Sequence, residues 1–527
     1  MPKDKEDLKG RQHKRQLKQQ RSEEARQKRR ELKTSNKSRK LSKRKIFLIV
    51  LLFSMIVVTI LVWQFSIKHF TSIYIRSDGT IDPSTTTITH LDNNQYTFSA
   101  DIFGSIIIER DNIVLDGNRH ILHGEIDTNS TGIELNGRSN VTITDLKIKD
   151  FKYGIFLKSG TNIVLSKNVL INEYGMGFES SFNNIIIENN ITNSIGAILL
   201  AQSSNNTISR NNLDNNTYGL NLDYGSSTNT IYRNLMSNNE EAIILAKGSN
   251  NNSLCENNLE KNKQGISLDQ TLFNIIDGNT ITDDEGAIGL IYSSYNQITA
   301  NSITGSQYNI ILTFNSRSNN IYGNKIRNGD AAITLTSFSN NNTLFENIIE
   351  TNTEGIRLAN SSYNLMVANT LTDCEGAIGL TSSSNNQITE NNITDNQYGL
   401  SITSDSVSNS ISGNYIENSD LAIGFLNSSN NQITENNIIN NEFGVYLNSS
   451  SDNSFFHNNF LNNTYQAVSI ESFNTWNNEN LISGNFWSDY EEKYPDAKIL
   501  EQLKIWSIPY IIDEYNQDNY PLVNCET

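Results

Sequence analysis

The hexapeptide Ile388-Thr-Glu-Asn-Asn-Ile393 sets the pattern of this chain: an apolar residue, two free positions, Asn, one free position and a second apolar residue. The pattern occurs fourteen times in succession at intervals of 21 to 23 residues, and its two outer positions are always apolar. A fixed period of this length predicts a solenoid, in which each repeat is one supersecondary unit. The repeated asparagines are Asn168, Asn189, Asn211, Asn234, Asn257, Asn279, Asn301, Asn324, Asn347, Asn369, Asn391, Asn414, Asn436 and Asn458.

A second element accompanies each hexapeptide. Segments such as Gly399-Leu-Ser-Ile402 and Ala377-Ile-Gly-Leu380 alternate apolar with polar or small residues, which is typical of a short strand with one buried face. Each repeat then holds three short strands and about four inward apolar side chains, too few for a core of its own. The predicted fold class is therefore all-β, a single-stranded parallel β-helix in which each strand pairs with its copy in the next coil. The handedness of β crossovers favours a right-handed coil.

The first residue of this second element marks each coil. It returns from Gly132 to Ala467, which predicts sixteen or more coils of about 22 residues. Ala fills the marker in every second coil, 45 residues apart, so the solenoid grew by copying a two-coil unit. The hexapeptide Asn suits a bend because Asn tolerates left-handed backbone, and its amide can hydrogen-bond to the same amide one coil away. We expect these asparagines to form a structural ladder.

Proline and composition divide the chain. The five prolines stand at positions 2, 83, 495, 509 and 521, and none interrupts the 411 residues from Ser84 to Tyr494, as expected where backbone amides pair between coils. We predict an N-terminal cap with the first coils at 68–130, the β-helix repeats at 131–480 and a C-terminal cap at 481–527. Three of the four tryptophans lie at or near this last segment, where they would cover the open end of the core.

Charge is distributed unevenly. Residues 1–45 carry 19 Lys or Arg and 6 Asp or Glu, a formal charge of +13, whereas the chain as a whole carries −16 and its remainder −29. The first 45 residues predict a disordered basic tail, and the acidic remainder should repel nucleic acid. Cys255, Cys374 and Cys525 give neither a disulfide framework nor a metal-ligand spacing.

One segment predicts a membrane anchor. Residues 46–67 contain no charged side chain, and this run is long enough to span a bilayer as a helix. The basic residues Lys43-Arg44-Lys45 precede it. The excess of positive charge on that side predicts a single-pass protein of the cell membrane with a cytoplasmic N-terminus and an extracellular β-helix. A cleaved signal peptide is the alternative, but the basic lead is too long for one and no small-x-small cleavage site follows.

Both ends of the predicted solenoid carry distinctive motifs. The entry motifs are Ile73-Tyr-Ile-Arg-Ser-Asp-Gly-Thr-Ile-Asp-Pro83 and Asn112-Ile-Val-Leu-Asp-Gly-Asn-Arg-His-Ile-Leu-His-Gly124, and the exit motifs are Gly484-Asn-Phe-Trp-Ser-Asp-Tyr490 and Ile508-Pro-Tyr-Ile-Ile-Asp-Glu-Tyr-Asn-Gln-Asp-Asn-Tyr-Pro-Leu522. Over roughly 73–522 the chain resembles the periplasmic copper-binding (NosD-type) β-helix family, most closely its archaeal surface members. The resemblance implies a right-handed parallel β-helix, grouped with carbohydrate-binding and sugar-hydrolase solenoids, and no defined activity.

The resemblance also raises the question of metals. Family members usually carry an Asp/Gly-rich, calcium-loop-like run between the two exit motifs, but here the segment from Glu491 to Ser507 has no glycine and a single aspartate. Copper would need soft or imidazole ligands that cluster in space. No third ligand is evident beside the His120 and His123 pair, so we expect no metal and no cofactor. The donors considered are His120, His123, His457, Met176, Met236, Met366 and two of the cysteines.

Carbohydrate chemistry has two sets of candidate residues. Glu354, Arg357, Asp373 and Glu375 form the densest charged cluster, and the two glutamates should lie about 5 Å apart on adjacent coils, a separation that suits retaining glycoside hydrolysis. Solvated charges on an acidic surface are the simpler interpretation, because coils of 21 to 23 residues leave little room for the loops of a cleft.

Tyr218, Tyr308 and Tyr398 precede the marker at intervals of four coils, about 19 Å, and could bind a long glycan. Inheritance from the copied two-coil unit explains the same spacing.

The function expected from the sequence is a membrane-anchored extracellular β-helix acting as a structural or adhesive surface protein, with glycan binding as a further role. The alternative is a carbohydrate-active enzyme, a polysaccharide lyase or glycoside hydrolase, and a copper-handling maturation factor is third. We expect a protein without catalytic activity whose partners are the membrane and a polysaccharide or surface glycan. The sequence leaves the ligand and the oligomeric state open.

Overall fold

The computed structural model describes residues 14–34, 45, 47–52, 55–56, 70–92, 94–125 and 129–525. It divides into two compact units, Met1–His69 and Phe70–Thr527. In the first unit, residues 14–34 are helical with every side chain exposed, where the sequence predicted disorder. This segment is dominated by Lys, Arg, Glu and Gln, which are strong helix formers.

The predicted membrane span lies mostly outside the described residues. Of positions 46–67 the structure describes 47–52, 55 and 56, which have helical backbone. Within the described part of the chain, none of the helices has the length and apolar character needed to cross a membrane.

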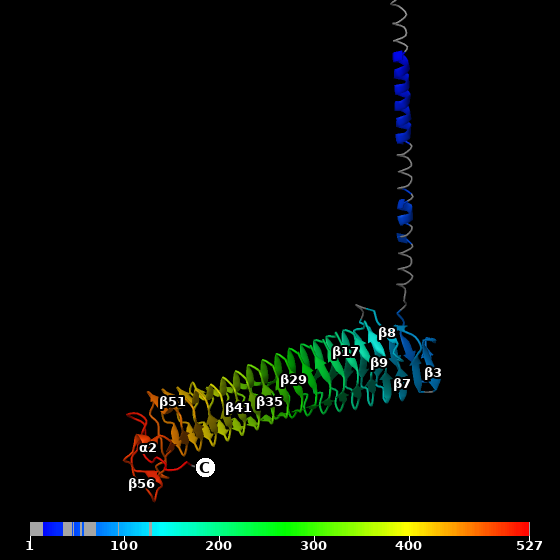
Figure 1. The fold of residues 1–527 in the computed structure, drawn as a ribbon. Helices are drawn as coiled ribbons and strands as arrows, with labels where there is room; N and C mark the ends of the chain where they lie inside the picture. Colours follow the sequence, from blue (N-terminus) through cyan, green and yellow to red (C-terminus); the bar gives the residue numbers. More distant parts are fainter. Residues whose placement is uncertain are drawn as a thin grey trace, which may run out of the picture. The chain divides into compact units, whose positions relative to one another are not determined.

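The second unit is a parallel β-helix of about 17 turns (Figure 1). Each coil contributes one strand to each of three parallel sheets, and strands pair in register with their copies in neighbouring coils, as in the pairing of Gly376 with Tyr398. The sixteen predicted coils correspond to the sixteen six-residue strands from β9 to β54. The first of the three sheets, here called the long-strand sheet, consists of β1 (Ile73–Ile75), β2 (Ile81–Asp82), β6 (Ile106–Ile108), β9 (Thr131–Asn136), β12 (Tyr153–Lys158), β15 (Tyr174–Glu179), β18 (Gly196–Ala201), β21 (Tyr218–Asp223), β24 (Glu241–Ala246), β27 (Gln264–Asp269), β30 (Gly286–Ile291), β33 (Tyr308–Thr313), β36 (Ala331–Thr336), β39 (Glu354–Ala359), β42 (Gly376–Thr381), β45 (Tyr398–Thr403), β48 (Leu421–Leu426), β51 (Phe443–Asn448) and β54 (Tyr465–Ile470).

The second and third sheets are built from shorter strands. The second sheet consists of β3 (Ile88–Asp92), β4 (Gln95–Phe98), β7 (Ile113–Asp116), β10 (Val141–Thr144), β13 (Val164–Ser166), β16 (Ile185–Ile187), β19 (Thr207–Ser209), β22 (Thr230–Tyr232), β25 (Ser253–Cys255), β28 (Ile275–Asp277), β31 (Gln297–Thr299), β34 (Asn320–Tyr322), β37 (Thr343–Phe345), β40 (Leu365–Val367), β43 (Gln387–Thr389), β46 (Ser410–Ser412), β49 (Gln432–Thr434) and β52 (Ser454–Phe456). The third sheet consists of β5 (Ile102–Phe103), β8 (Ile121–His123), β11 (Lys147–Lys149), β14 (Val169–Ile171), β17 (Asn190–Thr192), β20 (Asn212–Asp214), β23 (Leu235–Ser237), β26 (Asn258–Glu260), β29 (Thr280–Thr282), β32 (Ser302–Thr304), β35 (Lys325–Arg327), β38 (Ile348–Glu350), β41 (Thr370–Thr372), β44 (Asn392–Thr394), β47 (Tyr415–Glu417), β50 (Asn437–Ile439), β53 (Asn459–Leu461) and β55 (Phe486–Trp487).

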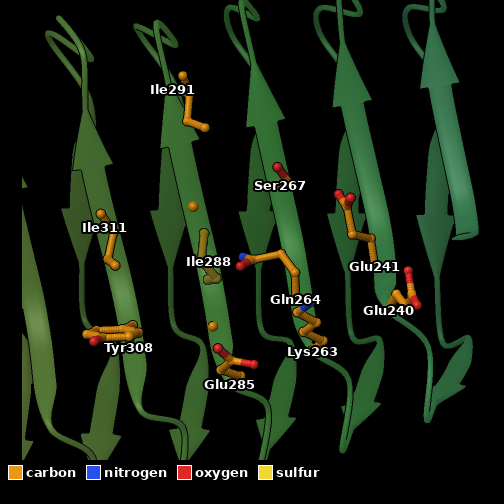
Figure 2. Close-up of a pocket in the computed structure, with 12 residues that line it drawn as sticks. Glu240, Glu241, Lys263, Gln264, Ser267, Glu285, Ile288, Ile291, Tyr308 and Ile311 are labelled. Carbon is orange, nitrogen blue, oxygen red and sulfur yellow. The ribbon is translucent and has the colours of Figure 1, made fainter. Parts of the chain in front are cut away.

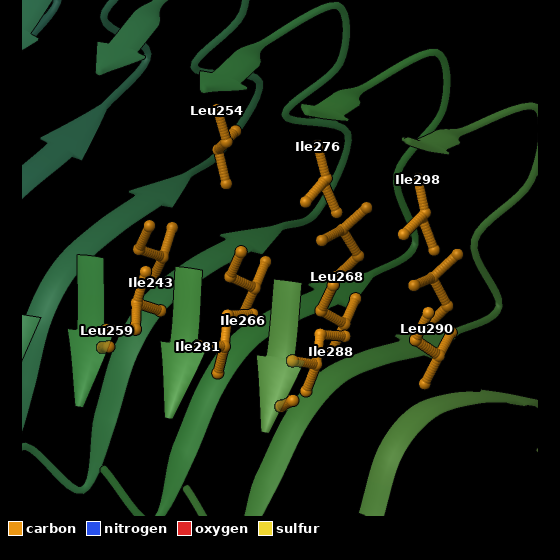
Figure 3. Packing of buried hydrophobic residues seen from close by; sticks show 14 of the residues in the cluster. Ile243, Leu254, Leu259, Ile266, Leu268, Ile276, Ile281, Ile288, Leu290 and Ile298 are labelled. Atoms are coloured by element: carbon orange, nitrogen blue, oxygen red, sulfur yellow. The ribbon is translucent and has the colours of Figure 1, made fainter. Parts of the chain in front are cut away.

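The core is a set of columns of like residues. In Figure 3, Ile243, Ile266 and Ile288 form one column from the long-strand sheet, and Leu268 and Leu290 belong to a second column from that sheet. Leu254, Ile276 and Ile298 come from the second sheet, and Leu259 and Ile281 come from the third sheet. A typical coil buries two large apolar side chains from its long strand and one from each short strand, all essentially inaccessible to solvent. The sequence-based count of four inward side chains per coil is therefore what the structure has.

The hexapeptide spans the bend between the second and third sheets. The fourteen predicted asparagines are at most 1% exposed and form one stack, in which each carboxamide Nδ2 donates to the Oδ1 of the next coil at 2.9–3.1 Å. The backbone N–H of each donates to the same oxygen, as Asn391 does to Asn414 at 3.0 Å.

The left-handed backbone of this bend lies one residue earlier than predicted. It belongs to the residue before each Asn, such as Glu390 with φ of 56°, and none of the fourteen asparagines has a positive φ. The Asn side chain must point inward to reach the next coil, so the preceding residue makes the turn.

The structure contains a second Asn stack that the sequence analysis missed. It lies at the end of the turn between the long-strand and second sheets, and its Nδ2-to-Oδ1 distances are 2.9–3.3 Å. Its members are Asn184, Asn206, Asn229, Asn252, Asn274, Asn296, Asn319, Asn342, Asn364, Asn386, Asn409, Asn431 and Asn453. A third, interrupted stack lies between the third sheet and the long-strand sheet and includes Asn239 and Asn262.

Separate structures close the two ends of the coil stack. Two antiparallel pairs, β1 with β2 and β3 with β4, lie at the N-terminal end. The C-terminal end holds helix α2 (Tyr490–Lys493), the hairpin β56 (Ile499–Leu500) with β57 (Ile505–Trp506), and the hairpin β58 (Tyr510–Ile511) with β59 (Gln517–Asp518). Trp476 and Trp487 are buried there against Phe455 and Phe460, at ring-centroid distances of 4.3 and 4.4 Å.

Candidate functional site

The outward face of the long-strand sheet collects most of the predicted site residues. A long strand such as β42 buries its third and fifth residues in the core, and its second residue is a small one held against the next coil. A Cβ on Gly399, the second residue of β45, would lie 2.5 Å from the backbone oxygen of Ala422, so only a very small residue fits there. The first, fourth and sixth residues therefore form the outward face.

One shallow depression on this face is floored by glycine. Gly376 and Gly379 are the first and fourth residues of β42, and a Cβ added to either would meet nothing within 4 Å. Glu354 and Arg357 of the preceding coil stand opposite these two glycines, and Tyr398 of the following coil stands opposite Gly376. We call this depression, of about 310 Å³, the Gly376 slot.

The same arrangement occurs four coils earlier. Gly286 and Gly289 of β30 form the floor of a depression of about 400 Å³, the Gly286 slot, with Gln264 on one side and Tyr308 on the other. Figure 2 shows Gln264 reaching from β27 toward β30. Its Oε1 lies 2.4 Å from where a Cβ of Gly286 would stand, so this side chain partly covers the slot. The Gly376 slot is open by comparison.

The two slots have acidic walls. Glu354 and Glu375 line the Gly376 slot with a single cation, Arg357. Glu240, Glu241, Glu285 and the single cation Lys263 line the Gly286 slot. Partial burial raises the pKa of Glu241, and the charge of Glu240 raises it further while that of Lys263 lowers it. Both slots therefore have a surplus of negative charge.

The predicted catalytic cluster is only partly assembled. Glu354, Arg357 and Glu375 line the Gly376 slot, but Asp373 does not; it lies exposed in the preceding bend with φ of 54°. Arg357 Nη1 donates to both carboxylate oxygens of Glu354, at 3.3 and 3.2 Å. This ion pair stands beside an open depression rather than over an enclosed cleft.

The three predicted tyrosines differ in their surroundings. Tyr308 and Tyr398 are 42% and 40% exposed and each borders a glycine slot. Tyr218 is less exposed, and the space above its neighbour Gly196 is filled by Leu199, whose Cδ2 lies 2.7 Å from an ideal Cβ. Two of the three tyrosines therefore stand beside a depression.

Sequence analysis overlooked the glycines that make the slots. A pair of glycines three residues apart, as at 286 and 289 or 376 and 379, occupies two successive outward positions of one strand. That spacing, repeated 90 residues later beside a tyrosine, was visible in the sequence and marks a strand without outward side chains.

The donors considered for copper do not fit a metal site. Met176, Met236 and Met366 are buried in the core with no exposed surface. His120 lies beside Asp101 at 3.4 Å, and His123 stacks on Phe103 at 4.3 Å. Among the residues that the structure describes, no group of three or more His, Cys, Asp or Glu side chains could hold a metal ion.

Comparisons with known proteins identify the repeats. The sequence model of "Periplasmic copper-binding protein (NosD)" matches residues 237–353 and 313–492, and that of "Right handed beta helix region" matches residues 131–281. No curated protein sequence matches the chain. None of these findings bears on the expected closeness to archaeal surface members.

Several solved structures are similar in fold. A variant of the periplasmic alginate epimerase AlgG is 13% identical, with 76% of this chain and 82% of that chain covered and a TM-score of 0.32. A variant of the catalytic domain of a GH87 α-1,3-glucanase, in complex with nigerose, is 14% identical, with 66% of each chain covered and a TM-score of 0.32. An exopolygalacturonase from Thermotoga maritima is 10% identical, with 55% of this chain and 72% of that chain covered and a TM-score of 0.27. At these values we draw no functional conclusion from the likenesses.

Proposed function

The chain belongs to the NosD-type right-handed β-helix family, and on this fold we propose a cell-surface structural protein whose long-strand face binds glycan chains without cleaving them. The observation that carries the proposal is the pair of equivalent glycine slots, each with a tyrosine on the same side, four coils or about 19 Å apart. A flat floor beside an exposed ring accepts an extended chain lying along the solenoid, and two sites on one rigid face bind a polymer with avidity.

The wall charges suggest which glycans bind. Both slots have more carboxylates than cations, and the chain beyond residue 45 carries a formal −29. Like charges in apposition oppose binding, so uronate-rich polysaccharides are disfavoured. We propose neutral or amine-bearing glycans as the ligand class.

Attachment to a membrane is the second part of the proposal. It rests on the sequence alone: a run without charges at 46–67 and the basic residues that precede it. A β-helix carried on such an anchor would present its long-strand face outside the cell.

Binding can be tested with the full chain on an array of neutral, amine-bearing and acidic glycans. Tyr398→Ala removes the ring, and Gly379→Val fills the Gly376 slot where nothing obstructs a side chain. Both variants should weaken binding, while Gly379→Val should leave folding intact or stabilise it, because valine suits a strand better than glycine.

The matched control is Tyr415→Ala, a ring 37% exposed on the third sheet. Equal losses in the control and in Tyr398→Ala, or unchanged binding by Gly379→Val, would contradict a site in the slot.

A carbohydrate-active enzyme is the second candidate. Its specific support is that Glu354 and Glu375 line the same slot. Against it stands the ion pair of Glu354 with Arg357, which occupies both oxygens of one of the two carboxylates that hydrolysis would need.

A further inference from the structure

Six aromatic side chains stand exposed at the turn between the long-strand sheet and the second sheet, on five successive coils. Their exposed fractions lie between 48% and 62%, among the largest for apolar side chains of the solenoid. We call them the aromatic ridge. They are Phe273, Tyr292, Tyr295, Phe314, Phe338 and Tyr363.

The backbone makes this choice of residues unfavourable for folding. All six have positive φ, between 49° and 66°, and five of them stand at positions where most other coils place Asn or Ser, such as Asn205 and Asn430. Left-handed backbone costs an ordinary L-residue about 1–2 kcal/mol, and Asn less. Bulky rings that are strained and exposed contribute little to the fold, which points to a role on the surface.

Four of the six rings stack in two pairs. Phe273 stacks on Tyr295 at a centroid distance of 5.3 Å, and Tyr292 on Phe314 at 5.5 Å, with interplanar angles of 19° and 25°. Because the stacked partners belong to successive coils, their faces look along the solenoid and their edges point outward. A sugar ring needs an exposed face, whereas outward edges suit edge-to-face packing against other aromatic rings.

The turns that carry the aromatic ridge contain almost no charged side chains. The turn residues 270–274, 292–296, 314–319, 337–342 and 360–364 contain one charged side chain, Arg317. The same turn is uncharged in other coils too, as at 202–206 and 382–386, whereas the chain beyond residue 45 is strongly acidic. Two copies should therefore repel each other least along this side of the solenoid. The cores of protein interfaces are likewise depleted of charge and enriched in Tyr, Phe and Arg.

We propose that the aromatic ridge is the interface through which a second copy of this chain docks. Rings of 150–250 Å² at these exposures offer roughly 600 Å² per copy. Ile275 and Ile291, 40% and 36% exposed beside the ridge, add to this. A standard interface buries about 800 Å² per partner. A ridge pairing with its own copy is the isologous contact of a two-fold dimer.

The test compares the mass of the full chain, purified in detergent, with that of the triple variant Tyr292→Asn, Phe314→Asn, Phe338→Asn by light scattering. A reductant is present because Cys525 is exposed. Wild type should be a dimer that dissociates on dilution. The dissociation constant of the triple variant should be about a thousandfold higher or more, at roughly tenfold per ring. At a dilution at which both chains are monomeric, its melting temperature should equal that of wild type or exceed it, since Asn tolerates left-handed backbone and the dimer no longer contributes to stability.

The matched control is Tyr224→Asn, which has φ of 51° and is 58% exposed at the same kind of turn but outside the ridge. It should keep the dimer. The proposal is overturned by a wild type that stays monomeric, by a dimer that persists in the triple variant, or by a triple variant that melts lower than wild type when both are monomeric. Loss of glycan binding in the triple variant, with its mass unchanged, would assign the ridge to carbohydrate instead.

Discussion

At the residue scale, the carboxamide of the hexapeptide Asn does more than fill a bend. In the coil of Asn391, Nδ2 donates to Asn414 Oδ1 at 2.9 Å and to the carbonyl oxygen of Met366 at 3.0 Å. Its Oδ1 accepts from both the backbone N–H and the Nδ2 of Asn369, each at 3.0 Å. One side chain thus pairs buried polar groups of three coils, and no apolar residue of similar size can replace it.

Asn391→Leu should therefore lower the free energy of unfolding by roughly 1–3 kcal/mol, because it leaves buried donors and acceptors of the neighbouring coils unpaired. Asn392→Ser, at the exposed first position of β44, should change it by less than about 0.5 kcal/mol. Chemical denaturation of the two variants provides the measurement. Equal destabilisation at both positions would mean that the inward and outward assignments are mistaken.

Asp284 is an exception in the third stack. Its Oδ1 accepts from Asn262, but its buried Oδ2 has no hydrogen-bond partner in the described structure. The preceding asparagines use the equivalent atom to donate to a strand carbonyl, as Asn262 does to Met236. Burial raises the pKa of Asp284 to about 7.

Asp284 should consequently make stability depend on pH. Between about pH 4 and 7 the folded chain holds a proton that the unfolded chain has released, so stability falls as pH rises through that window and is constant above it. Asp284→Asn should remove this dependence and stabilise the chain at about pH 8 by up to ~4 kcal/mol. Thermal melts across pH give the comparison, with Asp395→Asn, an exposed aspartate at the equivalent turn five coils away, as control. An unchanged pH profile in Asp284→Asn would contradict the assignment.

At the element scale, the C-terminal cap ends the ladder with a carboxylate. The stack runs one way, each amide donating toward the C-terminus, so its last member, Asn485, is left with donors facing the end of the solenoid. Buried Asp518 accepts from the backbone N–H of Asn485 at 2.7 Å, from Trp487 Nε1 at 2.9 Å and from the backbone N–H of Tyr520 at 2.9 Å. The Asp518 carboxylate accepts hydrogen bonds from donors that would otherwise pair with a further coil.

Asp518→Ala should lower the free energy of unfolding the cap by roughly 3–5 kcal/mol, because it leaves two buried N–H donors and one half-buried N–H donor without a partner. We expect faster amide exchange in β55 and β53 than in strands near the middle of the solenoid. Asp496→Ala, an exposed carboxylate of the same cap, is the control. Unaltered exchange at the cap would show that Asp518 is not its closing group.

The elements were predictable to different degrees. Periods of two and 22 residues revealed the marker strands and the bend around Asn391, because those positions must be apolar, small or amide-bearing in every coil. The stack containing Asn184 and the left-handed backbone at Glu390 were missed, since the analysis followed only one Asn per repeat and assigned the turn to it. The slot at Gly376 depends on which exposed residues stand opposite each other on adjacent coils. The repeat of buried positions, from which the fold was predicted, carries no information about that arrangement.

At the scale of the whole molecule, the sequence divides into a basic start, an uncharged run and an acidic solenoid. If the run at 46–67 spans a membrane with its basic flank inside, protease added to intact cells should remove residues beyond about 70 and leave the tail attached. Immunodetection of the tail and of the solenoid after digestion makes the measurement. Digestion of the first 45 residues would reverse the orientation, and a mature chain that starts near residue 66 would restore a cleaved signal peptide.

The last prediction concerns chemistry along the whole solenoid. Cleavage of a glycosidic bond needs an acid and a base held at one scissile bond, best with water excluded. The Gly376 slot is open, and its Glu354 is tied to Arg357 through both oxygens. We therefore expect the full chain to bind glycans but to release no reducing ends from neutral, amine-bearing or acidic polysaccharides. Glu354→Gln and Glu375→Gln should leave that zero rate unchanged. Cleavage by the wild type that either variant abolishes would make the slot an active site and would replace the structural proposal with the enzymatic one.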